Sequence, residues 1–320
     1  MTVEGVRTMA MHEFRLRLRA GRWRWLLGAW FATLLALTVF LRWALLESGQ
    51  TEPGTDMFGG LMLFMLGLAL LVVPALTAQS VNGDRERGVL AMLQTTLLTP
   101  AEIALGKLIA AWAVALGFLA TSLPLVLWCV AEGGVSPAQV AVCLGVTALL
   151  LGVMCAIAQC LSSLLARSTT SAALSYVTVF AMTVGTLIAF GLAVALTPQP
   201  VTADPGSAPF EPTVSRPDRV WWLLAPNPFV VVADAAPRSA QPSFDSEFRL
   251  DPLGNIGRSV RSLRDEVTVD GVPVTNGASD RPVWPYGLAA NLALGLGALA
   301  VTSRRLRAPY GRLPRGIRVA

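Results

Sequence analysis

Histidine and charged residues are scarce in this sequence, and their scarcity excludes several classes of protein. The 320 residues include a single histidine, His12, so a metal site built on two or three histidines cannot form. Charged residues make up only 14% of the chain, against roughly 25% in soluble domains. We therefore expect neither a soluble enzyme nor a zinc hydrolase, and we expect no metal ion bound by this chain.

Cysteine is also rare, and its placement excludes a disulfide framework. The four cysteines lie inside apolar runs and lack CxxC spacing, so we expect buried thiols. They are Cys129, Cys143, Cys155 and Cys160. The formal net charge of +5 comes almost wholly from arginines, and by itself it does not indicate nucleic acid as a partner; we expect none.

Apolar residues, by contrast, are abundant and gather in runs long enough to cross a bilayer. The hydrophobic set makes up 54% of the chain, and a membrane-spanning helix needs about 20 consecutive apolar residues. These runs lack the alternation of barrel strands, so they must form helices that satisfy their own backbone groups. The sequence predicts an all-α integral membrane protein with six transmembrane helices, near Trp25 to Leu46, Met57 to Ala78, Leu108 to Ala131, Ala138 to Ala166, Ala172 to Leu196, and Trp284 to Thr302.

The distribution of arginine predicts the orientation. Arginines crowd the segment 1–24 before the first span and the tail 303–320 after the last, and such clusters stay on the cytoplasmic side. Both termini are therefore expected to be cytoplasmic, with 1–24 a basic amphipathic segment at the membrane surface. Spans one to five would fill 25–196 and span six 284–302.

One long segment, 197–283, is rich in Pro, Asp, Ser and Arg and should lie outside the cell, because an even number of spans places it there. Within it, residues 220–233 are apolar but are broken by Pro226 and Pro228, and they are short for a span. We expect a re-entrant or interfacial segment, and the sequence does not choose between the two.

The loop 79–107, between the second and third spans, has the most specific pattern. From Asp84 to Gln94 an acidic start is followed by apolar residues, which predicts a short amphipathic helix able to dock on a partner. Thr99, Pro100 and Glu102 then match the N-cap, N1 and N3 positions of a capping box. The new helix should run through Lys107 into the third span, so that the loop forms a rigid elbow.

This loop resembles that of the permease subunit of type-2 ABC exporters. The resemblance rests on Asp84-Arg85-Glu86-Arg87-Gly88-Val89-Leu90, on Leu97-Leu98-Thr99-Pro100, and on Glu102 with Gly106-Lys107. Val89 stands where many members carry Thr. The six spans and the long connection before the sixth also fit the family's plan.

The resemblance implies a half-transporter in the inner (plasma) membrane of a bacterium, which exports an apolar or amphiphilic substrate by alternating access. It implies two partners: a cytosolic ATPase subunit, which binds ATP and Mg²⁺, and a second permease, identical or different, alongside membrane lipids. This chain would bind no cofactor and would not be an enzyme. The family's coupling helix maps to Asp84 through Leu93, and the residues implied in ATPase coupling are Asp84, Arg85, Glu86, Arg87, Gly88, Leu90, Leu93, Thr99, Pro100, Glu102 and Lys107.

Several alternatives stay open. The charged loop can also be explained by membrane topology alone, with its caps serving helix stability. Gln159 and Asn291 are polar groups within spans that either join helices by hydrogen bonds or line a substrate path. A membrane sensor or interaction protein, or an intramembrane lipid-modifying enzyme, is the alternative function. The sequence does not name the cargo.

Overall fold

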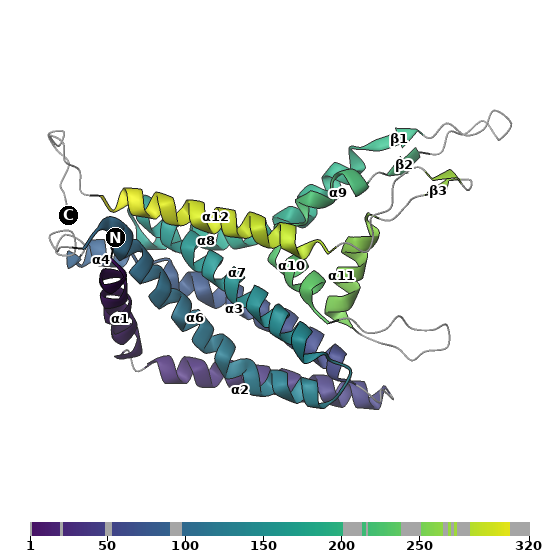
Figure 1. Cartoon of the computed structure of the whole chain (residues 1–320), viewed down its shortest axis with the longest axis horizontal. Coiled ribbons are helices and arrows are strands. Elements are labelled where there is room, and N and C mark those ends of the chain that lie inside the picture. The colour runs from purple at the N-terminus through teal and green to yellow at the C-terminus, as the bar shows by residue number, and fades with distance from the viewer. Residues whose placement is uncertain are drawn as a thin grey trace.

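Six long helices form the framework of the molecule (Figure 1). The computed structural model describes residues 2–19, 22–48, 53–89, 98–200, 213–215, 217–237, 251–264, 268–269, 272–273 and 282–307. The candidate spans within these ranges are α2 (Arg22–Glu47), α3 (Gly54–Thr77), α6 (Pro100–Ala131), α7 (Pro137–Leu164), the composite α8–η1–α9, and α12 (Trp284–Arg305). All six predicted spans are confirmed as helices, and the chain is a multi-pass membrane protein.

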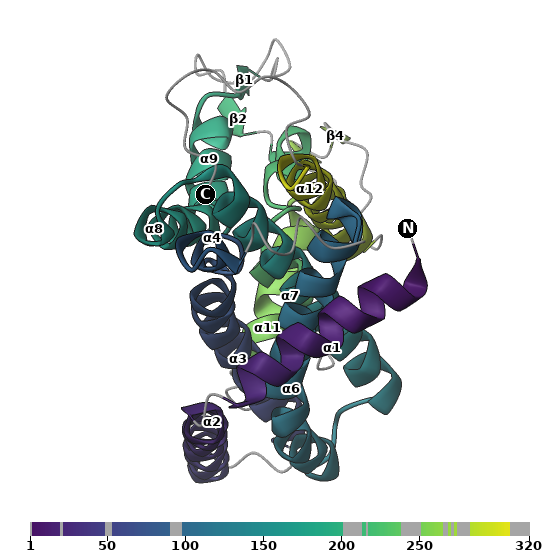
Figure 2. The ribbon, with the colours of Figure 1, turned by 90° about the vertical axis from the view of Figure 1, so that its left-hand side faces the viewer.

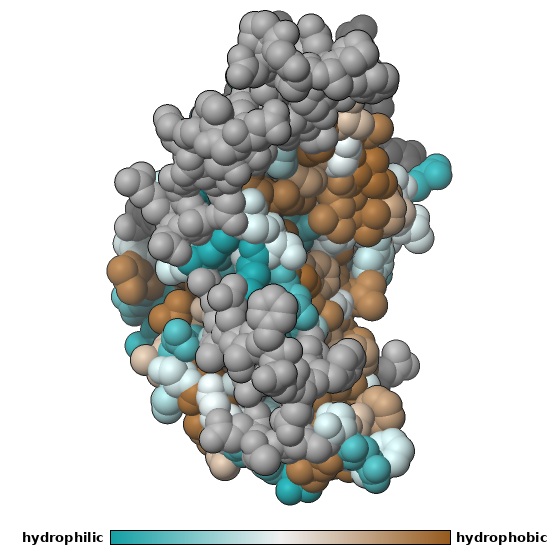
Figure 3. All heavy atoms as spheres, turned by 90° about the vertical axis from the view of Figure 1, so that its right-hand side faces the viewer, coloured by the Kyte–Doolittle hydropathy of each residue, from teal (hydrophilic) through white to brown (hydrophobic). Residues whose placement is uncertain are grey.

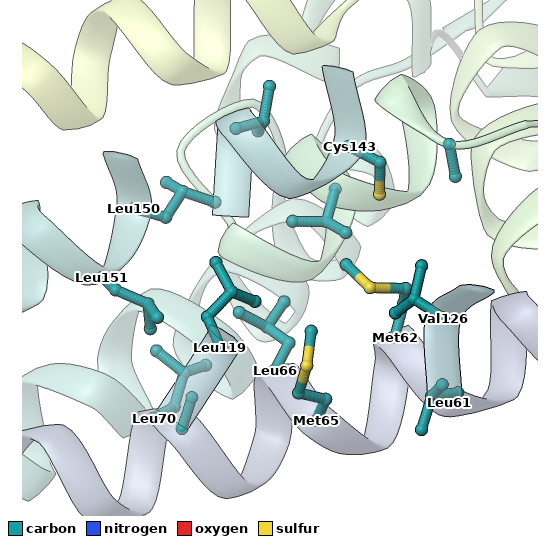
Figure 4. Close-up of a cluster of buried hydrophobic side chains, with 14 of the residues drawn as sticks. Leu61, Met62, Met65, Leu66, Leu70, Leu119, Val126, Cys143, Leu150 and Leu151 are labelled. Carbon is teal, nitrogen blue, oxygen red and sulfur yellow. The ribbon is translucent and has the colours of Figure 1, made fainter. Parts of the chain in front are cut away.

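The helices α3 and α7 form the centre of the bundle, and the other spans pack around them. In the most apolar stretch of each span, 56% of the residues of α3 and of α7 are buried, against 22% in α2 and 17% in the fifth span. Leucine and methionine side chains of α3, α6 and α7 interlock in the core (Figure 4). The four cysteines are buried free thiols, as predicted.

The fifth span contains a local irregularity that the sequence did not reveal. It runs as α8 (Ser168–Phe180), a π-helical turn η1 (Ala181–Gly185) and α9 (Thr186–Ala195). Asn227 donates a hydrogen bond through Nδ2 to the carbonyl oxygen of Thr183 (2.7 Å) and another to Oγ1 of Thr186 (2.9 Å). A π-turn changes the backbone hydrogen-bonding pattern, and here Asn227 bonds to the carbonyl oxygen of a residue within it.

The apolar segment 220–233 is divided into two short helices. It follows the 3₁₀ helix η2 (Pro217–Arg219) and contains a second one, η3 (Trp221–Leu223), then a turn, then α10 (Pro228–Ala235), which begins at an Asn227 N-cap. Nearly all of α10 is buried, against α3, α7, α11 and α12. With eight residues α10 is far too short to cross a bilayer. The segment therefore does not cross the bilayer as a continuous helix, and α10 packs into the bundle.

The rest of the connection between spans five and six contains little regular structure within the described residues. Helix α11 (Pro252–Ser262) begins at Asp251, whose carboxylate accepts a hydrogen bond from the Gly254 amide, and it packs beside α10. Two short antiparallel ladders pair β1 (Pro198–Pro200) with β2 (Thr213–Ser215) and β3 (Thr268–Val269) with β4 (Val272–Pro273). Hydrophobic side chains reach the surface at this end of the molecule (Figure 3).

A buried carboxylate fixes α12 to the α10–α11 hairpin. Asp234 accepts hydrogen bonds from Nε of Arg261 (2.5 Å) and from the backbone amides of Val283 (2.6 Å) and Trp284 (2.8 Å). The first amides of a helix have no partner within the helix, so a carboxylate there satisfies them and complements the helix dipole. We call Asp234, Arg261 and these two amides the Asp234 cluster.

Candidate functional site

The predicted coupling loop lies at the end of the bundle opposite the Asp234 cluster, where α1 (Val3–Arg19) crosses α6 (Figure 2). Directly after α3, helix α4 (Asn82–Glu86) occupies this end. Met9 of α1, Val81, Ile103 and Leu306 share a small apolar core, so both ends of the described chain meet here. This agrees with an even number of spans, while the assignment of this end to the cytoplasm stays a prediction.

The predicted helix from Asp84 through Leu93 is not continuous. Helix α4 ends at Glu86, and Gly88 has a φ of 72°, in the left-handed region that favours glycine and stops a right-handed helix. The prediction went wrong because amphipathic spacing was extended across a glycine that serves as a helix stop. Leu90 and Leu93 belong to residues 90–97, which lie outside the described residues.

The ammonium group of Lys107, the only lysine of the chain, is fully buried between two carboxylates. Its Nζ lies 2.5 Å from Oδ2 of Asp84 and 3.1 Å from Oε2 of Glu13. A buried charge is costly unless it is paired and hydrogen-bonded, and Lys107 meets that condition by joining α4 and α1 to α6. Asp84 and Lys107 were each predicted as residues of the site, but their pairing was not, and Glu13 was not predicted at all.

Two arginines form further ion pairs with the same two carboxylates. Arg17 lies 3.4 Å from Oε1 of Glu13, and Arg87 lies 3.1 Å from Oδ1 of Asp84. We call these five residues, Glu13, Arg17, Asp84, Arg87 and Lys107, the Lys107 cluster. Lys107 is completely covered, whereas the Arg87 side chain is 69% exposed, so the cluster runs from the interior to the surface.

The predicted capping box is present and does more than cap a helix. Oγ1 of Thr99 accepts from the Glu102 amide (3.3 Å), and Oε2 of Glu102 accepts from the Thr99 amide (2.8 Å). The other carboxylate oxygen of Glu102 accepts from the amide (2.5 Å) and the hydroxyl (3.0 Å) of Thr2. Glu102 therefore fixes the start of α6 to the start of α1.

A close approach holds α1 against α6. A Cβ added to Gly106 would lie 2.6 Å from Cβ of Met9 and 3.1 Å from the backbone nitrogen of Ala10, so only glycine fits. Met9 itself is 3% exposed. Helix α1 is thus packed on α6 by apolar contact as well as by the polar groups of Glu13 and Thr2.

Helix α4 also contacts the turn between the fourth and fifth spans. Oγ of Ser162 accepts from the amides of Val81 and Asn82, each at 3.1 Å. Arg85 donates to the carbonyl of Leu165 (3.3 Å), and Glu86 accepts from the amide of Ser168 (3.3 Å). A displacement of α4 would therefore reach α6 through Lys107 and the α7–α8 turn through Arg85 and Glu86.

The structure divides the predicted coupling residues into an inner and an outer set. Asp84, Glu102 and Lys107 are buried, so they cannot touch a partner directly and can act only by holding α4, α6 and α1 together. Pro100 and Arg85 are half-buried. Exposed members are Glu86, Arg87, Gly88 and Thr99, which form the surface available to a partner.

Gln159 and Asn291 both form hydrogen bonds within the bundle. Gln159 donates to the carbonyl of Ala104, and Asn291 donates to the carbonyls of Pro226 and Gly287. Both side chains are at most 1% exposed, so their observed contacts are those of groups joining neighbouring segments. Their role in a substrate path stays a prediction.

Helix α1 and the residue before it supply the contacts of this site that the sequence did not reveal, through Thr2, Met9, Glu13 and Arg17. One signal was present in the sequence. A chain whose cations are otherwise all arginine has one lysine, and its compact ammonium suits a closed site between two carboxylates. Which acid lies beside it is a matter of tertiary packing, because Glu13 and Lys107 are 94 residues apart.

Six apolar helices with a short charged helix fixed to the start of the third define a membrane component of a transport system. The model of the ABC-2 family transporter proteins matches residues 34–232, which is more than half of the chain. The chain therefore belongs to this family and is an ABC transporter permease. The match includes α4 and Lys107 but not α1. A comparison with curated proteins finds no match.

Proposed function

We propose that this chain is the membrane-spanning permease of an ATP-driven exporter, which moves an apolar or amphiphilic substrate out of a bacterial cell by alternating access. ATP and Mg²⁺ bind to a separate cytosolic ATPase subunit, and a second permease completes the path. The end of the bundle with α1 and α4 faces the cytoplasm. Family membership supports the permease role, and the arginine-rich termini support this orientation.

One observation carries the proposal: α4 presents exposed charges on its outer side and is attached on its inner side to a transmembrane helix by a buried ion pair. Glu86 and Arg87 are exposed, whereas Asp84 is paired with the fully buried Lys107. A docked ATPase that moves the outer surface of α4 would therefore move the start of α6. A charged loop serving topology alone has no need of a buried ion pair.

Glu86→Ala and Arg87→Ala test this proposal in the complex of the permease with its ATPase subunit, reconstituted in vesicles. The measured quantity is the stimulation, that is, the rate of ATP hydrolysis by the complex divided by the rate of the isolated ATPase subunit. We expect each change to reduce this stimulation about tenfold, which corresponds to about 1.4 kcal/mol of coupling. Membrane insertion and thermal stability should stay close to wild type, because both side chains lie on the surface.

Glu47→Ala and Arg219→Ala are the matched controls. Both residues are exposed, and they end α2 and η2, outside α4 and the Lys107 cluster. They should leave the stimulation unchanged. Wild-type stimulation in both Glu86→Ala and Arg87→Ala would contradict the proposed docking surface.

A further inference from the structure

A cavity of about 270 Å³ lies beside the Lys107 cluster, between α1, the end of α3, α4 and the start of α2. Its volume is close to the lower limit of small-molecule sites, roughly 300–1,000 Å³. Four of the five members of the Lys107 cluster line it, namely Glu13, Arg17, Asp84 and Arg87. The role proposed above for α4 does not require this cavity.

Ser80, which also lines the cavity, carries a hydroxyl group without a partner. The residue is only 7% exposed, and its Oγ forms no hydrogen bond. Other buried serines do form hydrogen bonds: Ser162 accepts hydrogen bonds from two backbone amides, and Ser171 donates one to the carbonyl of Ala78. A buried hydroxyl without a partner is uncommon. Its oxygen has almost no accessible surface, so a ligand in the cavity would reach it after rotation of the Ser80 side chain.

The charges around the cavity favour an anion. The Lys107 cluster contains three cations and two carboxylates, which leaves a net charge of +1. The carboxylates of Glu13 and Asp84 already bond to the buried Lys107. Arg17 has five N–H donors, and its hydrogen bonds to Glu13 and to the carbonyl of Leu76 are all 3.4 Å long, so it can give stronger ones to an anion.

Apart from Gln79, the remaining wall of the cavity is apolar. Trp23, Leu26, Leu76 and Val114 line it; the first three lie near the ends of α2 and α3, and Val114 lies in α6. Tryptophan and arginine are typical of the depth at which lipid headgroups meet acyl chains. A ligand that fits this wall has an anionic head and an apolar chain.

We propose that this cavity binds the headgroup of an anionic phospholipid from the adjoining leaflet. The phosphate accepts hydrogen bonds from the guanidinium groups of Arg17 and Arg87 and, once the Ser80 side chain has rotated toward the cavity, from Ser80 Oγ. The first carbons of one acyl chain lie along Leu26, Leu76 and Val114. The rest of the lipid stays in the bilayer. Because the lipid would contact Arg87 and Arg17, its presence would stabilise the junction of α1 and α4.

Binding of dioleoylphosphatidylglycerol to the delipidated chain in mild detergent tests this proposal, with native mass spectrometry reporting the number of lipids bound per chain. Wild type should show one saturable site. We expect both Arg17→Gln and Ser80→Ala to weaken binding about tenfold or more, as for the loss of one hydrogen bond to a charged group. Ser80→Ala should leave the lipid-free melting temperature unchanged, because its hydroxyl forms no bond to lose.

Two variants serve as controls. Arg15→Gln removes an exposed arginine of the same helix that does not line the cavity, and Ser163→Ala removes a buried serine whose hydroxyl donates to Cys160. Both should bind the lipid as wild type does. The assay needs no ATPase subunit, so its result is independent of the proposed transport function.

Three outcomes would overturn the proposal. The first is equal affinity of wild type, Arg17→Gln and Ser80→Ala. The second is equal binding of dioleoylphosphatidylcholine, which would show that the net positive charge selects nothing. The third is displacement of the lipid by an equal concentration of inorganic phosphate, which would identify a free-phosphate site in place of a lipid site.

Discussion

The two ends of the helical bundle each contain a buried ion pair, but they are built differently. In the Asp234 cluster one carboxylate is bonded to Arg261 and to two backbone amides at the start of α12. In the Lys107 cluster the carboxylates of Glu13 and Asp84 are held by side-chain cations, and the paired residues come from α1, from α6 and from α4 with its C-cap Arg87. Backbone amides have fixed positions, whereas paired side chains can follow a moving helix.

This difference indicates which end is suited to movement. Asp234 fixes the α10–α11 hairpin to the first turn of α12 and leaves little freedom between them. Asp84 and Glu13 can keep contact with Lys107 through small rotations of their side chains while α4 or α1 shifts. We therefore expect the Lys107 cluster to transmit displacement and the Asp234 cluster to resist it.

Removing the buried ammonium should have the largest effect. Lys107→Met keeps the length of the side chain but leaves two carboxylates without their shared cation, and we expect a loss of about 3–5 kcal/mol in the free energy of unfolding. Thermal unfolding in mild detergent measures it. Adding Glu13→Gln and Asp84→Asn to Lys107→Met should recover most of the loss, because no uncompensated charge is left in the interior. A near-wild-type melting temperature for Lys107→Met alone would contradict the buried pairing.

Asp234→Asn should have a smaller and local effect. The amide keeps one acceptor oxygen but loses the charge opposite Arg261, so we expect a loss of about 1.5–3 kcal/mol. Hydrogen exchange should speed up at the first turn of α12, residues 283–287, and stay unchanged at the start of α6. Faster exchange at both ends would contradict the separation of the two clusters.

Gly106→Ala should have the smallest effect of the three, and it tests how closely α1 packs on α6. The added methyl group collides with Met9, and relief requires α1 to move away from α6; we expect a loss of about 1–3 kcal/mol, measured as above. Gly117→Ala in the same helix is the control, since its Cβ would lie 3.6 Å from Trp23, an ordinary contact. Equal melting temperatures for both variants would show that α1 is not tightly packed at Met9.

Local features of the structure were predictable from the sequence. The six spans follow from runs of apolar residues, and the capping box follows from Thr99, Pro100 and Glu102, whose interaction spans a single helical turn. Asp251 followed by Pro252 is a comparable signal for a helix start, and α11 begins there, although no helix was predicted at this position.

Features set by tertiary contact were not predictable. The partner of Lys107 on α1 and the bond from Asn227 to the π-turn join residues far apart in the chain. The break at Gly88 was readable in principle, since glycine is the usual residue at a helix C-terminus, but the amphipathic pattern favoured a longer helix. The role of the residues predicted for coupling stays a prediction, and the division of the described ones into buried and exposed sets required the structure.

The central claim, that this permease works with a separate ATPase, is tested most directly by purifying the tagged chain from its native membrane in mild detergent. We predict that a second polypeptide is recovered at close to one copy per permease and that the preparation hydrolyses ATP. Recovery of the folded, intact chain without a second polypeptide and without ATP hydrolysis would contradict the account.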